Sequence, residues 1–241
     1  MAGHSKWSNI KRKKGAADQK RAKIFTKIGR EIQVAVREGG ADPETNTKLK
    51  DVIAKARSNN MPNDNIQRSI AKAAGSASSE SFEEIQYEGY GASGVAFMVR
   101  TLTDNRNRTA GDVRHSFDKF GGNLGTSGCV SFMFEVKGVI VLEKELYEDA
   151  EQVMMHALEA GADDIEEEDE VYVITTSPEL FHEVVAYLEK ENYVFASSTV
   201  EPVPENYMSV TDPAAVEQLE KLIDVLEEND DVQDVYHNWE Q

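Results

Sequence analysis

Residues 66–99 read IQRSIAKAAGSASSESFEEIQYEGYGASGVAFMV, and the spacing of apolar residues changes within this stretch. Before Gly75-Ser76-Ala77-Ser78-Ser79, apolar residues recur every three or four positions, as on one face of a helix. After it, Val95, Phe97 and Val99 alternate with their neighbours, as on one face of a strand. A run of small residues between two such patterns is typical of a linker. The stretch therefore predicts a helical domain followed by an α+β part.

Three amphipathic helices are predicted upstream of this linker. Asp18 is a candidate N-cap for a helix that ends at Gly39-Gly40. Asp42-Pro43 predicts the start of a second helix, because Pro is favoured at the first helical position. Asn63 is expected to cap a third helix that stops at Gly75. Three such helices with short connections predict a small bundle.

Strand-like and helix-like segments alternate downstream of the linker. The alternation of Val130, Phe132 and Phe134 predicts a strand, and the acidic run 163–170 predicts a solvated loop. Asp212-Pro213 predicts the start of a last helix, for the same reason as above.

The order of these segments predicts an α+β protein: an N-terminal three-helix domain followed by two ferredoxin-like units. The second unit is expected to be inserted into the first, because chain ends that lie close together make insertion easy. The predicted domains are residues 1–75, residues 80–136 together with 205–241, and the inserted residues 137–204.

The charge of the chain is divided unevenly. Residues 1–75 hold 17 Lys and Arg against 7 Asp and Glu, a balance of +10, whereas residues 76–241 have a balance of −28. A basic end attracts polyanions and an acidic end repels them, which orients their encounter. Because salt limits the reach of charge to about 10 Å, this local balance matters more than the net charge of −18. We therefore expect the N-terminal domain to bind a nucleic acid.

The candidate phosphate-binding residues lie in a basic arm and along the helix that follows it. Binding to a nucleic-acid backbone requires many flexible cations along one track, since each neutralised phosphate releases counterions. A solvated charge run is the alternative for these residues, and Trp7 either packs on the bundle or stacks on an unpaired base. The residues predicted to bind nucleic acid here are Lys6, Trp7, Lys11, Arg12, Lys13, Lys14, Lys20, Arg21, Lys23, Lys27 and Arg30.

A second candidate site is the segment 104–109, DNRNRT, between a strand and a helix. Arg106 and Arg108 at a helix start can hold a phosphate by charge, together with free backbone N–H groups. In the alternative, Asn107 or Thr109 caps the helix while the two arginines pair with nearby acids. Both alternatives stay open, and Arg106 and Arg108 are included among the predicted nucleic-acid-binding residues.

Residues 89–94, GYGASG, match the pattern G-x-G-x-x-G of dinucleotide-binding proteins. That site requires a helix directly after the glycines, whose N-terminus binds the pyrophosphate. A strand is predicted there instead, so we expect a glycine-rich turn.

No enzymatic motif is visible in the sequence. It contains no G-x-S-x-G, P-loop or H-E-x-x-H pattern, and its five His and single Cys129 lack metal-ligand spacing. We therefore predict a protein that is not an enzyme, with no catalytic residue, metal, cofactor or small-molecule substrate. A hydrolase that uses His115 is the weakest alternative.

The sequence also indicates where in the cell the protein is expected. No apolar run approaches the roughly 20 residues that cross a bilayer, and the first 15 residues lack the apolar core of a signal peptide. A single cysteine fits a reducing environment. A cytoplasmic protein without a membrane partner is expected.

Several segments resemble the YebC family, in order along the whole chain. They are Met1–Lys11, Asp18–Ile24, Gly39–Pro43, Asn60–Pro62, Thr103–Thr109 and Gly121–Gly125. The resemblance implies a helical domain and two α+β domains. It also implies a DNA-binding transcriptional regulator or, as for some relatives, a translation factor on the ribosome that relieves stalls at proline-rich stretches.

Two functions from different classes follow. The first is a regulator of gene expression that binds DNA or ribosomal RNA through its basic domain. The second is a protein-interaction module with an acidic surface, in which the basic arm serves only solubility.

Overall fold

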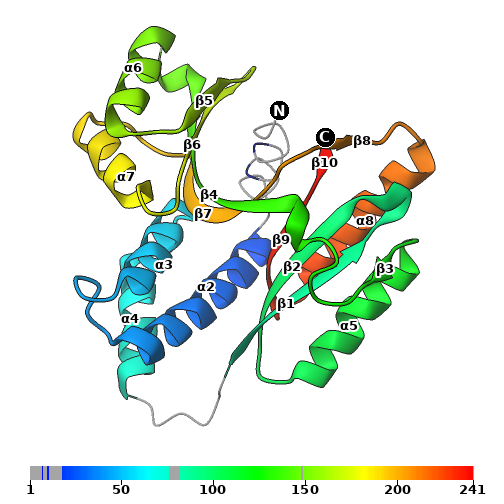
Figure 1. Ribbon diagram of the computed structural model, residues 1–241. Helices are drawn as coiled ribbons and strands as arrows, with labels where there is room; N and C mark the ends of the chain where they lie inside the picture. The colour runs from blue at the N-terminus through cyan, green and yellow to red at the C-terminus, as the bar shows by residue number, and fades with distance from the viewer. Residues whose placement is uncertain (1–6, 8–9, 11–17, 76–81, 148, 241) are drawn as a thin grey trace. The chain divides into compact units, whose positions relative to one another are not determined.

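The computed structural model describes Trp7, Ile10 and residues 18–75, 82–147 and 149–240. This part of the chain is α+β: three helices precede two four-stranded antiparallel sheets with their helices (Figure 1), which confirms the predicted fold class. The chain forms two compact units. Of the described residues, unit 1 contains Trp7, Ile10, 134–147, 149–207 and Glu240, and unit 2 contains 18–75, 82–133 and 208–239. The division into three domains, one of them inserted, stays a prediction.

Three helices open unit 2. They are α2 (Asp18–Gly39), α3 (Thr47–Ser58) and α4 (Asn63–Gly75). The predicted helix ends at Gly39 and Gly75 are confirmed. Helix α2 packs along both of the others (Figure 1). Their shared apolar core contains Ile28, Ile32, Leu49, Val52, Ile53, Ile66 and Ile70.

The predicted start of the second helix at Asp42-Pro43 is wrong. A turn follows these residues, and α3 begins after the N-cap Asn46. The side-chain oxygen of Asn46 accepts the N–H of Leu49 at 3.0 Å, and its amide nitrogen donates to the carbonyl of Ala35 at 2.8 Å. Asn46 thus caps α3 and binds α2 at once, which places the helix start where a local Asp-Pro signal does not show it.

A first four-stranded sheet, sheet A, completes unit 2. Its strands are β1 (Glu83–Tyr90), β2 (Ala96–Thr103), β3 (Asn123–Leu124) and β9 (Val232–His237), in the order β3-β1-β2-β9. Helices α5 (Arg106–Lys119) and α8 (Pro213–Glu228) cover one of its faces (Figure 1). The core between them contains Phe97, Val99, Val113, Phe117, Leu219, Leu222 and Leu226.

The glycine-rich segment between β1 and β2 is a turn, as expected. The short 3-10 turn η1 (Ala92–Gly94) leads directly into β2, so no helix follows the glycines. A Cβ atom at Gly91 would lie 2.6 Å from the ring of Phe97 and 2.9 Å from Leu219. Close packing therefore explains this glycine.

The strand predicted over residues 130–134 is wrong in its first half. Ser131–Met133 form a short 3-10 turn, η2, and strand β4 starts only afterwards. The buried carboxylate of Glu88 accepts the backbone N–H groups of Val130 and Ser131, both at 2.9 Å. These N–H groups are therefore not available for strand pairing.

The second sheet, sheet B, forms unit 1. Its strands are β4 (Phe134–Glu143), β5 (Asp164–Glu167), β6 (Val171–Thr176) and β7 (Ser197–Pro204), in the order β5-β6-β4-β7. Its helices are α6 (Ala150–Ala160) and α7 (Phe181–Lys190). This strand-helix-strand-strand-helix-strand order is that of ferredoxin-like folds. Sheet A has as many strands but begins with a hairpin.

The acidic run 163–170, for which the sequence predicts a solvated loop, contains strand β5. This strand pairs with β6 from Asp164 opposite Thr175 to Glu167 opposite Tyr172. It lies at the edge of sheet B, where charged side chains are common because they discourage pairing with another chain. The turn η3 (Lys144–Leu146) and the short pair β8 (Met208–Ser209) and β10 (Trp239–Glu240) complete the described elements.

Candidate nucleic-acid interface

The basic arm falls largely outside the described residues. These predicted binding residues are Lys6, Lys11, Arg12, Lys13 and Lys14. Lys20 belongs to the first turn of α2, and Arg21 follows it with an exposed side chain.

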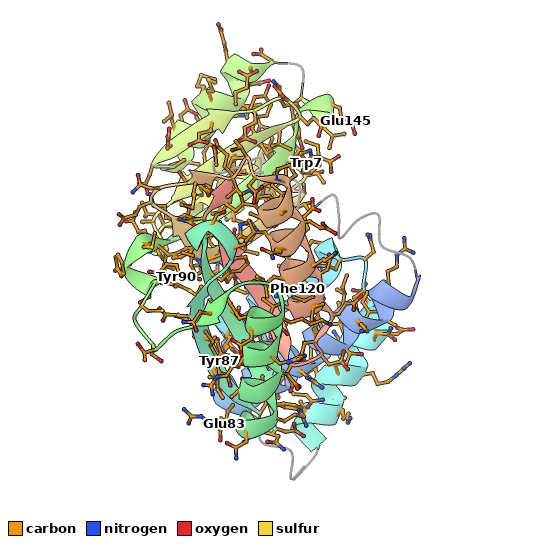
Figure 2. All side chains as sticks on the ribbon, turned by 90° about the vertical axis from the view of Figure 1, so that its right-hand side faces the viewer. Trp7, Glu83, Tyr87, Tyr90, Phe120 and Glu145 are labelled. Atoms are coloured by element: carbon orange, nitrogen blue, oxygen red, sulfur yellow. The ribbon has the colours of Figure 1, made fainter. Side chains whose placement is uncertain are left out.

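Trp7, by contrast, is described and half-buried in unit 1 (Figure 2). Its indole packs on a cluster of four strand residues, Val139, Val141, Val171 and Val173. The indole N–H donates to the carboxylate of Glu170. Of the two alternatives for Trp7, the structure therefore shows an apolar packing role, although against sheet B and not against the helical bundle. Stacking on a base stays a prediction.

Two predicted cations of α2 reach the C-terminal end of α8. The Lys23 Nζ atom donates to the carbonyl of Glu228 at 3.1 Å. The Lys27 Nζ atom donates to the carbonyl of Glu227 at 2.6 Å. The carbonyls in the last turn of a helix accept no hydrogen bond from an N–H of the same helix, and they form its negative end. Helix α8 has no basic residue in its own last turn, so α2 supplies the positive charge there.

Arg30 and Arg108, predicted in two separate sites, meet at one buried carboxylate. Arg30 donates to the Asp231 carboxylate at 2.9 Å and to the carbonyl of Asp230 at 2.7 Å. Arg108 donates to the other oxygen of Asp231 at 2.6 Å, as does the Thr109 hydroxyl at 2.8 Å. Burial raises the pKa of Asp231, but the bonds from Arg108, Thr109 and Arg30 outweigh it and lower the pKa overall.

The start of α5 shows features of the second alternative for segment 104–109, a capped helix and an arginine that pairs with acids. Its N-cap is Asn105, neither Asn107 nor Thr109, and the Asn105 side chain accepts the N–H of Arg108 at 3.1 Å. The Arg108 side chain pairs with Asp104 at 2.8 Å as well as with Asp231. Arg106 is exposed as well, but no acidic group among the described residues pairs with it. The two neighbouring arginines therefore lie in different surroundings.

A second buried ion cluster joins the helices to sheet A. Glu31 of α2 is 5% exposed and accepts from Lys55 of α3 at 2.8 Å and from Arg100 of β2 at 3.1 Å. Asp234 of β9 lies 3.5 Å from Lys55 and accepts from the Arg100 Nε atom at 3.0 Å. Burial lowers the pKa of Lys55, but Asp234 and Glu31 outweigh it and raise the pKa. Glu84 of β1 also lies 3.4 Å from Arg100, so five elements of unit 2 meet in a cluster of two cations and three carboxylates.

Sequence reasoning missed both clusters. Asp231 and Asp234 carry no local pattern that would indicate burial. Arg100 does carry a signal, because it interrupts the apolar strand over residues 95–103. Neighbours along a strand point to opposite faces, so Arg100 points away from the side of Val99 and towards α2. A charged residue at such a position predicts an ionic partner.

Unit 1 is strongly acidic. Residues 134–207 contain 3 Lys and no Arg, against 20 Asp and Glu. Among the described residues, no group of three or more His, Cys, Asp or Glu is arranged to hold a metal ion. In the same residues, no helix is long and apolar enough to cross a membrane.

Two family descriptions match the chain. The TACO1/YebC N-terminal domain matches residues 5–76, and the TACO1/YebC second and third domain matches residues 82–239. The linker predicted from the sequence falls at the boundary between the two matches.

Similar proteins are known along the full length. A "Probable transcriptional regulatory protein" of Acetivibrio thermocellus is 60% identical over 239 residues, which is 99% of each chain. A protein of the same description from Ruminiclostridium cellulolyticum is 59% identical over 241 residues, covering 100% of this chain and 97% of that one.

A solved structure supports the fold. The crystal structure of a conserved hypothetical protein from Aquifex aeolicus has a TM-score of 0.83 and 45% identity, and the match covers 92% of this chain and 91% of that one. The resemblance noted in the sequence is thus confirmed by family, relatives and fold together. The chain belongs to the TACO1/YebC family, a non-enzymatic family of probable transcriptional regulatory proteins.

Proposed function

We propose that this protein is a DNA-binding regulator of transcription that acts in the cytoplasm and holds DNA through residues 1–75. The main observation behind this proposal is the uneven charge of the chain, which has a net charge of +10 in these residues and −28 in the rest. The descriptions of the relatives as transcriptional regulatory proteins support DNA as the ligand.

Most of the binding energy is electrostatic on this proposal. Lys11, Arg12, Lys13 and Lys14 form four consecutive cations, and flexible cations of this kind contact phosphates without reading bases. Acidic unit 1 is repelled by DNA, so the encounter favours the basic region. Unit 1 is then available to a protein partner.

Salt dependence tests the proposal. The full chain is the right material, because Lys23, Lys27 and Arg30 bind residues 227–231, which a fragment 1–75 would lack. Fluorescence anisotropy with a labelled duplex of about 30 base pairs is measured from 0.05 to 0.3 M KCl. We expect affinity to fall steeply with salt, with a logarithmic slope of about −0.9 per phosphate contact. A flat response would contradict the proposal.

Replacing the four consecutive cations of the basic arm tests whether these residues bind phosphates. The variant with Lys11, Arg12, Lys13 and Lys14 changed to Ala should lose about 3.6 from the magnitude of that slope if each contacts one phosphate. If the chain is instead an acidic protein-interaction module, this variant retains full activity in cells.

Crosslinking in cells distinguishes DNA from RNA. Enrichment of promoter fragments supports the transcriptional role. Recovery of ribosomal RNA would select the alternative, a translation factor on the ribosome.

A further inference from the structure

We propose that DNA phosphates also contact an outer surface of the folded helices, formed by Lys50 and Arg57 of α3 and Arg68 of α4. We call these three residues the α3–α4 surface. The inference rests on the proposed function, and it assigns phosphate binding to residues that the sequence did not single out.

Three cations of α2 already bind acceptors within the protein. Lys23 and Lys27 bind the C-terminal carbonyls of α8, and Arg30 binds the buried Asp231. A phosphate would have to displace these acceptors before it could bind the same side chains. The side of α2 that looks most basic in the sequence therefore stabilises unit 2.

The two sides of α3 differ in what they face. Lys48 lies 3.7 Å from Glu84 of β1, and Lys55 lies 3.5 Å from Asp234 of β9. This side of α3 therefore faces sheet A. At 100° per residue, Lys50 and Arg57 lie roughly 160° around the helix from that side. They point away from sheet A.

Lys50 and Arg57 are available on that side. Both are exposed, and neither has an acidic partner within the described part of the chain. They are seven residues apart, about 10 Å along the helix axis, and Ala54 between them is small and exposed. Phosphates of one DNA strand recur about every 3.4 Å along the duplex axis, so the two side chains can bind separate phosphates.

Arg68 of α4 is the third residue that we assign to this surface. The buried residues of this helix are Ile66 and Ile70, and Arg68 lies on the opposite side at 100° per residue. It is exposed, and no acidic group among the described residues pairs with it. Three cations are thus directed to solvent, whereas Lys23, Lys27 and Arg30 of α2 bind within unit 2.

Charge removal at the α3–α4 surface tests the inference. In the full chain, Lys50→Gln, Arg57→Gln and Arg68→Gln are combined, and binding to the same duplex is measured from 0.05 to 0.3 M KCl. We expect the magnitude of the slope to fall by about 2.7 and the affinity at 0.05 M salt to fall roughly tenfold per lost contact. Each single variant should reduce the magnitude of the slope by about 0.9.

A matched control removes three cations elsewhere. The combination Lys137→Gln, Lys190→Gln and Lys221→Gln changes the net charge equally and should leave the slope unchanged. The charge-preserving set Lys50→Arg, Arg57→Lys and Arg68→Lys should also bind like the wild type. Circular dichroism verifies that each variant is folded.

The failures of the two proposals are distinct. If the wild type binds DNA with a steep slope and the α3–α4 variant keeps that slope, the inference is wrong and the proposed function stands. An equal loss in the control set would also overturn the inference, because the effect would then be one of net charge. A wild type with no salt dependence would overturn the proposed function itself.

Discussion

The guanidinium of Arg30 lies 2.9 Å from the carboxylate of Asp231, which is 201 residues away in the chain. Because Asp231 also binds Arg108 of α5, one carboxylate directly before β9 links α2 to α5 within unit 2. The three-helix region is therefore attached to sheet A by buried charge as well as by the linker.

Replacing Asp231 should destabilise unit 2. Asp231→Asn keeps the size of the side chain but leaves Arg30 and Arg108 without their shared counter-charge, and breaking a buried ion pair lowers the free energy of unfolding by about 3 kcal/mol. For a chain of this size, the melting temperature should fall by roughly 6–12 °C in circular dichroism. The control is Asp104→Asn, which removes an exposed partner of Arg108 and should change stability by less than about 1 kcal/mol. Equal effects of the two variants would contradict the role of Asp231.

Stability should decrease in acid through Glu88 and Asp231. For both carboxyls burial raises the pKa, but backbone N–H donors at Glu88, and Arg108, Thr109 and Arg30 at Asp231, lower it below the ordinary values of 4.5 and 3.8. The unfolded chain therefore takes up these protons first as the pH falls.

The contribution of both groups is present above about pH 4.5 and is lost as the pH falls through their native pKa values. In urea unfolding, the difference in free energy between the wild type and the double variant Glu88→Gln with Asp231→Asn should be constant from pH 7 to 5.5 and should shrink below pH 4.5. The free energy of unfolding of the double variant should therefore fall less steeply in acid. A fall as steep as that of the wild type would argue against these two groups.

Two glycines should respond to alanine with opposite signs. At Gly91 a Cβ atom would lie 2.6 Å from the ring of Phe97, so Gly91→Ala should lower the free energy of unfolding by about 1–3 kcal/mol. Gly111 lies within α5, and a Cβ there meets no atom within 4 Å, so Gly111→Ala should raise it by about 0.5–1 kcal/mol. Chemical denaturation measures both. Tolerance of Gly91→Ala would show that packing does not require this glycine.

Trp7→Ala should loosen unit 1 more than it weakens DNA binding. Loss of the indole exposes the valines of β4 and β6, so amide hydrogen exchange in these strands should accelerate. Anisotropy should detect less than a threefold loss of affinity. A residue that stacked on a base would lose about 1–3 kcal/mol of binding energy, and such a loss would favour stacking over packing.

Local signals predicted the parts of the fold that neighbouring residues determine. Helix α8 begins at Pro213 after the N-cap Asp212, as expected, because the Asp212 side chain accepts the N–H of Ala215 and Pro213 has no N–H to satisfy. Strand β2 contains Phe97 and Val99 of the predicted alternation, and Val95 lies directly before its first residue.

Features set by distant partners could not be read locally. Asn46 starts α3 because it also binds α2, and Glu88 removes Val130 and Ser131 from strand pairing across more than 40 residues. Strand β5 forms within an acidic run because β6 supplies its partner.

The candidate site likewise has one part that the sequence predicted and another that depends on distant partners. Composition located the basic region, since that requires only counting charges. Which cations remain exposed depends on packing: Lys27 and Arg30 are bound by residues 227–231, whereas Lys50 and Arg57 are not. The amphipathic pattern of α2 separates apolar from basic residues, but it does not distinguish a side that meets solvent from one that meets the end of another helix.

The bonds from Lys23, Lys27 and Arg30 to residues 227–231 join segments about 200 residues apart. A ribosome therefore produces α2 long before the carbonyls that will accept these cations exist. During that interval the new polypeptide presents its full positive charge to the surrounding RNA, and only completion of α8 and β9 withdraws it. Contacts between segments so far apart form slowly, so the newly made chain attracts RNA more strongly than the finished protein does.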